Sequence, residues 1–200
     1  MSLRTVLIIA LAAMGLWQGY SEWQLRPVHP PDGLTAPDDP EQTDVGKKAV
    51  TTLGRWRLTL QARYDITARI LSREDYHVDR LSDLIPEDLA LGWGPMSDNR
   101  VLRTLEITQG ARFYSWVPKQ ALPISRRAVI EHSANTHVIP ADVDVRRELK
   151  RLRVGQVVHL TGFLVNAVRD DGVYINTSLT RSDSGPGSCE VVLVERVEAW

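Results

Sequence analysis

The densest group of reactive side chains in the chain is the segment HSANTH at residues 132–137. Its two imidazoles, His132 and His137, could both reach a metal ion from a loop, with Asn135 between them as a carbonyl ligand or oxyanion donor. The spacing differs from the HExxH pattern of zinc enzymes, and the segment indicates no third ligand. The other interpretation, which we favour, is a structural turn whose polar side chains bond to the backbone.

A second segment with ligand-binding character is GWGPMSD at residues 92–98. Glycines on both sides of Trp93 permit a close backbone approach, so this indole could form the floor of a pocket. Trp93 could equally close one end of a barrel, and Asp98 has the sequence position of a helix N-cap. Neither residue indicates a ligand by itself.

A polar, glycine-rich loop, TRSDSGPGS, follows at residues 180–188. Arg181 and Asp183 are its two residues best suited to pair with a partner or with each other. The loop matches neither the P-loop nor the dinucleotide-binding glycine pattern, so we interpret it as a surface hairpin loop.

Cys189 is the one cysteine of the chain, so no internal disulfide can form. As a nucleophile it would need a neighbouring histidine, and the fold would have to bring His132 or His137 beside it. A buried, inert thiol is the default interpretation. No serine-hydrolase elbow or cofactor motif occurs, so we expect no cofactor and no resident metal. The sequence leaves open whether the chain is an enzyme.

The charge balance gives no support to a nucleic-acid partner. Lys and Arg total 24 against 25 Asp and Glu, for a formal net charge of -1. Nucleic-acid-binding domains usually carry a basic excess. The segment RFYSW at residues 112–116 interleaves one arginine with aromatic side chains, but a single such patch is insufficient. We therefore expect no nucleic-acid partner.

An uninterrupted apolar run at residues 6–17 follows Arg4 near the start of the chain. Its length lies between that of a signal-peptide core and that of a short membrane anchor. We favour an uncleaved anchor over residues 1–25, because aromatic residues typical of a membrane interface recur at a spacing of three: Trp17, Tyr20 and Trp23. Arg4 then predicts a single-pass inner-membrane protein with its C-terminal domain in the periplasm. Cleavage near residues 19–21 would instead secrete that domain to the periplasm.

The composition changes again at residue 26. Between residues 26 and 52, prolines alternate with acidic residues, and apolar side chains are too sparse to offset chain entropy. We predict an extended, mobile linker there. Residues 53–200 are then expected to form a single globular domain.

This domain is predicted to be α+β and mainly β. Residues 56–70 alternate strictly between apolar and polar side chains, which indicates a long strand with one buried face. The other predicted strands cover residues 106–116, 156–168, 173–179 and 190–197. Helices are predicted over residues 82–94, over residues 99–105, and from Asp142 or Asp144 to Gly155. This order indicates a small curved sheet or an OB-like barrel with short helices, preceded by an N-terminal hydrophobic helix.

Four segments together resemble a family of uncharacterised bacterial membrane-anchored proteins. They are GWGPMSD, QGARFYSW, HSANTHVIP and SLTRSDSGPGSCE, at residues 92–98, 109–116, 132–140 and 178–190. The resemblance covers most of the chain from about residue 64 onward. It implies a bacterial envelope protein and brings no known activity with it.

From these features we predict a membrane-tethered extracytoplasmic domain that binds another envelope component through one face. That face would include Trp93, Asp98, His132, Asn135, His137, Arg181 and Asp183. The alternative is a small hydrolase or metal-dependent enzyme that uses the His132 and His137 cluster with Asp98 or Glu190. An oligonucleotide-binding OB module is a third hypothesis.

Overall fold

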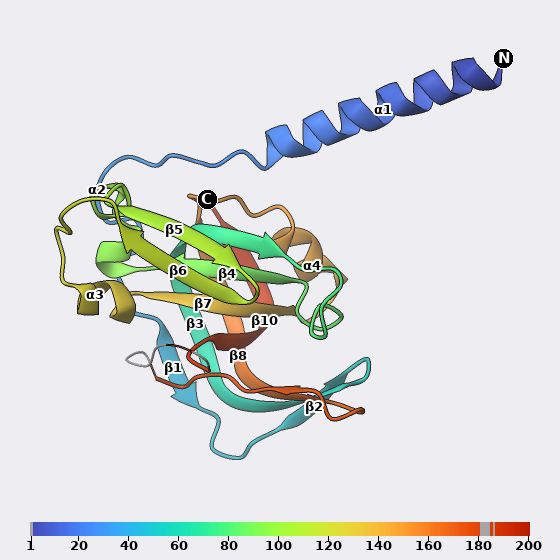
Figure 1. The fold of residues 1–200 in the computed structure, drawn as a ribbon. Coiled ribbons are helices and arrows are strands. Elements are labelled where there is room, and N and C mark those ends of the chain that lie inside the picture. The colour runs from blue at the N-terminus through green and yellow to red at the C-terminus, as the bar shows by residue number, and fades with distance from the viewer. Residues whose placement is uncertain (1, 181–184, 186) are drawn as a thin grey trace.

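The computed structural model describes residues 2–180, 185 and 187–200. A large mixed sheet, a two-stranded hairpin and several short helices make up the folded part of the chain (Figure 1). The prediction of a mainly β domain with short helices is confirmed.

The helices are short except at the N-terminus, and the strands vary widely in length. The helices are α1 (Leu3–Gln24), α2 (Asn99–Leu102), α3 (Arg126–Glu131) and α4 (Val143–Leu149), with a 3₁₀ turn, η1 (Gly94–Ser97). The first strands are β1 (Glu41–Asp44), β2 (Val50–Leu53), β3 (Trp56–Asp75), β4 (Glu87–Gly92) and β5 (Leu105–Gly110). The others are β6 (Phe113–Pro118), β7 (Ser133–Pro140), β8 (Val157–Arg169), β9 (Tyr174–Ile175) and β10 (Glu190–Ala199).

Five strands of the large sheet pair in a closed circuit, β3–β4–β7–β10–β8–β3. Among the described strands, β7 and β10 form the parallel pair, and their neighbours in the circuit pair antiparallel. Register shifts at two points bend β3, which lets it pair with both β4 and β8. The predicted long strand is confirmed, because one alternating set of its side chains is buried: Trp56, Leu58, Ala62, Tyr64, Ile66, Ala68 and Ile70.

The circuit separates a main core from an outer apolar layer. Leu89, Val138 and Val192, from three adjacent strands, pack in the main core together with side chains of α4. Ala90 is the next residue along β4, so it points to the opposite face and belongs to an outer cluster. Side chains of the β5–β6 hairpin pack against that outer cluster, and Figure 1 shows the hairpin lying over β4 and β7.

The helix predicted over residues 82–94 is wrong, because residues 87–92 form β4. The prediction relied on Pro86 and the two following carboxylates, which are helix-start signals. All six residues of β4 are buried, and the strand pairs with β3 on one side and β7 on the other. Burial on both faces outweighs local helix signals, and it places Glu87 and Asp88 on opposite faces of the sheet.

Other predicted elements differ in detail. Residues 106–116 contribute to both strands of the β5–β6 hairpin, and residues 132–140, interpreted as a turn, are mostly strand β7. The helix α3 was not predicted. The cap on α4 is confirmed, because the Asp142 carboxylate accepts two backbone N–H bonds of 2.8 Å from the first turn. That helix ends before Gly155, the predicted stop.

The helix α1 spans the segment for which a membrane anchor was predicted. Within the described residues, no helix combines the length and the apolar character needed to cross a bilayer. The anchor and the periplasmic location therefore stay predictions.

Residues 26–52 differ from the mobile linker that their composition predicted. Ala36 is fully buried, and the backbone N–H groups of Thr35 and Ala36 donate to the Ser97 hydroxyl at 3.1 and 3.2 Å. Both β1 and β2, which lie in this segment, pair with β3. Extended proline-rich backbone has no internal hydrogen bonds, so its polar groups are available to the η1–α2 turn and the sheet edge. Part of the expected linker therefore packs as part of the domain.

The closed circuit depends on a close approach of β8 and β10 at Gly162. A Cβ at this position would lie 2.0 Å from the carbonyl oxygen of Leu193, a backbone atom. We expect Gly162→Ala to lower the free energy of unfolding in urea by about 1–3 kcal/mol through overpacking. Gly110→Ala is the control, because a Cβ there meets nothing within 4 Å. Equal stability of the two variants would contradict this account of the β8–β10 contact.

Candidate active site

Three neighbouring strands align an acid, an imidazole and a thiol on the outer face of the sheet. Asp88 on β4 lies directly opposite His137 on β7 in the antiparallel pair. On the other side of β7, Val191 of β10 is the register partner of His137. Cys189 lies directly before β10, and its sulfur is 3.8 Å from the amide nitrogen of Asn135, which is on the same face of β7 as His137. The strand order therefore brings these three groups together.

His137 connects the acid to the thiol. Its Nδ1 lies 2.8 Å from Oδ1 of Asp88, and Cys189 is close enough to the ring to influence its pKa. Burial alone would lower the pKa of His137, but the interactions with Asp88 and Cys189 outweigh it and raise the pKa to about 9. Because Nδ1 is hydrogen-bonded to Asp88, Nε2 is the ring nitrogen available to interact with the sulfur. The ring therefore holds a proton that can pass to or from the thiol.

Asn135 lies beside this chain on the same strand face as His137. Its Nδ2 is 3.8 Å from Sγ of Cys189, 3.4 Å from Oδ2 of Asp88 and 3.1 Å from the carbonyl oxygen of Arg112. Gln109 donates to Oδ1 of Asn135 at 2.7 Å, so the amide is held with its NH₂ group toward the sulfur. This places the amide nitrogen of Asn135 next to the thiol.

Arg112 supplies the positive charge that a buried Asp88 requires. Its guanidinium donates to Oδ1 of Asp88 at 3.0 Å and makes two bonds of 2.8 Å to Asp79. It also lies over the Tyr76 ring, with 3.7 Å between the guanidinium carbon and the ring centroid. Arg112 occupies the tip of the β5–β6 hairpin, where it has a φ of 68°. The tip of this hairpin is thereby fastened to the acid of the candidate site.

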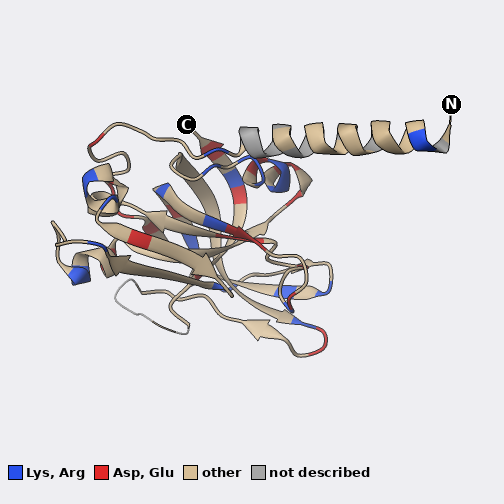
Figure 2. Ribbon diagram, turned by 45° about the horizontal axis from the view of Figure 1, so that its top comes forward, with Lys and Arg blue, Asp and Glu red and all other residues tan. Residues whose placement is uncertain are grey.

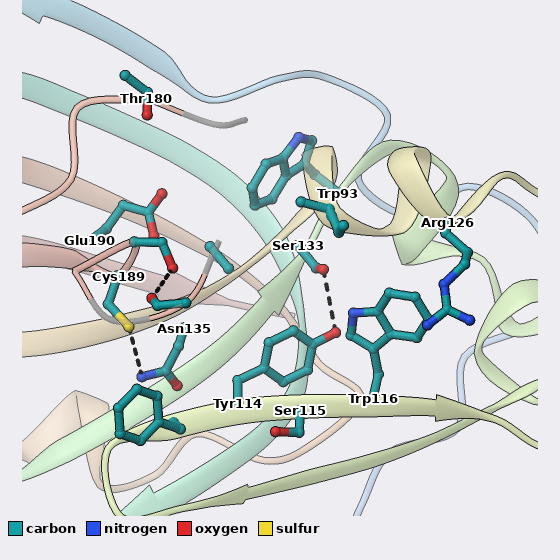
Figure 3. Close-up of a pocket in the computed structure, with 15 residues that line it drawn as sticks. Trp93, Tyr114, Ser115, Trp116, Arg126, Ser133, Asn135, Thr180, Cys189 and Glu190 are labelled. Carbon is teal, nitrogen blue, oxygen red and sulfur yellow. Dashed lines mark hydrogen bonds between the residues drawn. The ribbon is translucent and has the colours of Figure 1, made fainter. Parts of the chain in front are cut away.

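The thiol opens into a pocket of about 360 Å³ between the hairpin and the sheet (Figure 3). Cys189 and Asn135 line this pocket, whereas Asp88 and His137 lie behind them, at 0% and 4% exposure. Cys189 is half-buried. A reactive atom at the wall of a pocket, with its proton carrier shielded behind it, is the arrangement that nucleophilic catalysis requires.

Of the residues predicted from the sequence, Asn135 and His137 belong to this site and His132 does not. The Nδ1 of His132 bonds to the carbonyl oxygen of Ala128 at 2.8 Å, one turn earlier in the chain. Its ring also lies against Gly94, where a Cβ would come within 2.7 Å of the imidazole. His132 therefore closes the end of α3 and has a structural role.

Trp93 and Asp98 have partners that explain their burial. The Trp93 indole lines the pocket and donates to Asp39 at 3.0 Å. Asp98 caps α2 by accepting the Arg100 backbone N–H at 2.8 Å, as the sequence indicated. Side-chain bonds from Arg100 are the largest influence that lowers the pKa of Asp98 to about 2. Arg181 and Asp183 lie outside the described residues.

Asp88, Gln109 and Arg112 were missed as candidate site residues. The sequence pattern places Asp88 in a predicted helix and Arg112 in a basic, aromatic segment of the kind that contacts nucleic acid. One signal could have found Asp88: a carboxylate directly before the apolar run Leu89–Leu91, where a strand would bury it. Within the described residues, no group of three His, Cys, Asp or Glu side chains is placed to hold a metal ion.

The raised pKa of His137 predicts a pH-dependent stability. A proton bound more tightly in the folded state stabilises it fully below pH 6.5, and this stabilisation is lost as the pH rises through about 9. We expect urea unfolding to show a loss on the order of 2–3 kcal/mol over this range, and His137→Gln to remove it. His159→Gln is the matched control, because that histidine also bonds a carboxylate, Asp65, at 2.8 Å.

Glu87 contributes to the same measurement in a lower window. Burial outweighs the Arg73 guanidinium 2.9 Å away and raises the pKa of Glu87 to about 8. Its ionisation therefore destabilises the folded state as the pH rises from 4.5 through about 8. Glu87→Gln removes that part of the slope. Equal slopes above pH 8 in the native protein and in His137→Gln would contradict the assignment to His137.

Comparison with family models, with curated proteins and with solved structures found no match for this chain. The resemblance to bacterial membrane-anchored proteins therefore stays a prediction. The geometry around Cys189 is therefore the basis for inferring a function.

Proposed function

We propose that this protein is a cysteine-dependent acyl-transfer enzyme that cleaves an ester, thioester or amide. In this proposal Cys189 is the nucleophile and His137 transfers the proton. Asp88 orients the imidazole and stabilises its protonated form. The observation that carries the proposal is the position of His137 between Asp88, to which it is hydrogen-bonded, and Cys189, whose thiol lies at the wall of a pocket. This proposal is a more specific form of the hydrolase hypothesis. His132 has no role in it, and the Cys189 thiol takes the place of a metal ion.

The charge state of His137 sets the first step. With a pKa of about 9 the ring is protonated at neutral pH. In the proposed reactive pair the proton of the Cys189 thiol resides on His137, so the sulfur is free to attack. The Cys189 sulfur attacks the acyl carbon, and the carbonyl oxygen takes up the negative charge. The imidazolium then donates its proton to the leaving group as the bond to that group breaks. The product of this step is a thioester on Cys189.

The second step regenerates the thiol. His137, now neutral, accepts a proton from water or from another acceptor nucleophile, which attacks the thioester carbon. The acyl group leaves as an acid or as a new ester or amide, and the proton returns to the imidazole–thiol pair. Asn135 supports both steps, because its NH₂ group lies beside the sulfur and can donate to the oxyanion.

We also infer an OB-like barrel for the domain. Support comes from the closed circuit of five strands, from its parallel β7–β10 pair, and from the position of α4 between β7 and β8. The third hypothesis, an oligonucleotide-binding module, gains no support, because acidic and basic segments are interspersed over the domain (Figure 2) and the net charge is -1.

The reactivity of the thiol tests the proposal directly, because Cys189 is the single cysteine of the chain. We expect iodoacetamide to modify Cys189 in the full-length protein at pH 7. The rate of modification is measured by mass spectrometry. His137→Gln should slow the reaction about tenfold or more, because the thiolate loses its imidazolium. His132→Gln is the matched control and should leave the rate unchanged, since its ring bonds to Ala128.

A chromogenic ester provides the second measurement of the same prediction. The native protein should release a burst of p-nitrophenol from p-nitrophenyl acetate, in proportion to enzyme, as the Cys189 thioester accumulates. Cys189→Ser should abolish the burst. Equal alkylation rates in His137→Gln, His132→Gln and the native chain would overturn the proposal.

We further propose that the enzyme works in the bacterial envelope, where the N-terminal segment tethers it near its substrate. The apolar run at residues 6–17 and Arg4 before it support this location. A periplasm-active reporter fused after Trp200 should be active with the full chain and inactive when residues 2–25 are deleted. Activity that survives the deletion would contradict the tether, and it would leave the thiol chemistry untouched.

A further inference from the structure

The pocket beside Cys189 continues along an aromatic wall to a guanidinium. Figure 3 shows Cys189 and Asn135 at one end, Tyr114 and Ser133 in the middle, and Trp116 and Arg126 at the other end. Trp93 and Phe113 also line the cavity, so four aromatic side chains contribute to it. A bound acyl group that starts at the sulfur would therefore extend along apolar, flat surfaces toward a cation.

The middle of the pocket carries no charge. The Tyr114 hydroxyl and the Ser133 hydroxyl are 3.3 Å apart, and Ser133 donates to the carbonyl oxygen of Val129 at 2.6 Å. Burial raises the pKa of Tyr114 to about 12, so its hydroxyl stays neutral. An apolar or weakly polar body fits this region better than an ionised one, because a charge there would have no partner.

Among the described residues that line the pocket, Arg126 is the one cation. Its guanidinium lies over the Trp116 ring, with 5.0 Å between the guanidinium carbon and the ring centroid. Stacking uses one face of the guanidinium and leaves the N–H groups at its edge available to donate hydrogen bonds. No ion pair involves Arg126 among the described residues, whereas its neighbour Arg127 is bonded to Glu131 at 2.8 Å. The pocket therefore ends in a bidentate donor that no described carboxylate pairs with, and the carboxylate that lines the pocket, Glu190, lies at the Cys189 end (Figure 3).

We propose that the pocket selects acyl donors with a flat apolar body that ends in a carboxylate. The carboxylate pairs with Arg126, the body lies against Trp116 and the neighbouring aromatic wall, and the acyl carbon reaches Cys189. This inference rests on the proposed function, because it takes the thiol as the attacking atom. The fork of a guanidinium matches the two oxygens of a carboxylate, and a stacked guanidinium loses little freedom when it binds.

A pair of alkylating probes separates this inference from the proposed function. N-phenylchloroacetamide and N-(4-carboxyphenyl)chloroacetamide carry the same reactive carbon, and in each the Cys189 sulfur displaces chloride to form a thioether. In the native full-length protein we expect the carboxylate probe to react about fivefold to twentyfold faster, because of the charge-assisted pairing with Arg126. Mass spectrometry of the single cysteine gives both rates.

Two arginine variants provide the matched comparison. Arg126→Gln should abolish the preference for the carboxylate probe and leave the rate of the neutral probe unchanged. Arg127→Gln should retain the preference, because that guanidinium does not line the pocket. Benzoate should also protect Cys189 of the native chain from iodoacetamide, and this protection should be lost in Arg126→Gln.

The possible results are distinct. Equal rates for the two probes in the native chain, or a preference that survives in Arg126→Gln, would overturn the carboxylate selectivity while Cys189 remained a nucleophile. If neither probe nor iodoacetamide modified Cys189 faster than a free thiol, the proposed function would fail, and the selectivity would fail with it.

Discussion

The buried carboxylate of Asp88 is the constraint on which the candidate site depends. A fully buried anion is tolerated only when cations and N–H donors surround it, and leaving one unpaired typically costs about 3–5 kcal/mol. Arg112 and His137 both contact the same oxygen of Asp88, and Asn135 approaches the other. These three residues come from a hairpin tip and one central strand. The contacts that neutralise this one carboxylate therefore hold the β5–β6 hairpin, on one side of the pocket, against strand β7 on the other side.

The hairpin tip is strained, and its contacts explain how the strain persists. Ala111 and Arg112 have φ values of 49° and 68°, in the left-handed region that such residues rarely adopt. This conformation costs on the order of 1–2 kcal/mol for each residue. The bonds of Arg112 to Asp79 and Asp88, with the Asn135 bond to its carbonyl oxygen, offset that cost. The charge of the site and the shape of the pocket are therefore coupled through one residue.

Sequence patterns predicted the local features and missed the long-range ones. The alternation in residues 56–70 and the cap at Asp142 depend on neighbouring residues, and both are confirmed. Asn135 and His137 were candidates by residue type alone. Their partner Cys189 is joined to them by the parallel β7–β10 pairing, which no local pattern indicates. Asp88 was assigned to a helix, because adjacent carboxylates after a proline resemble a helix start until burial on both faces is known.

A purely structural role explains the arrangement poorly. Arg112 and Asp79 already form a network around Asp88, and replacing buried ionic groups with apolar side chains of similar volume is often neutral or stabilising. Arg112 already supplies a cation to Asp88, so charge balance alone does not require a second partner, His137, at the same oxygen. An inert core would also enclose Cys189, whereas its sulfur lies at the pocket wall. A polarised imidazole, a half-buried thiol and an oriented amide each have a use in acyl transfer that packing alone does not give them.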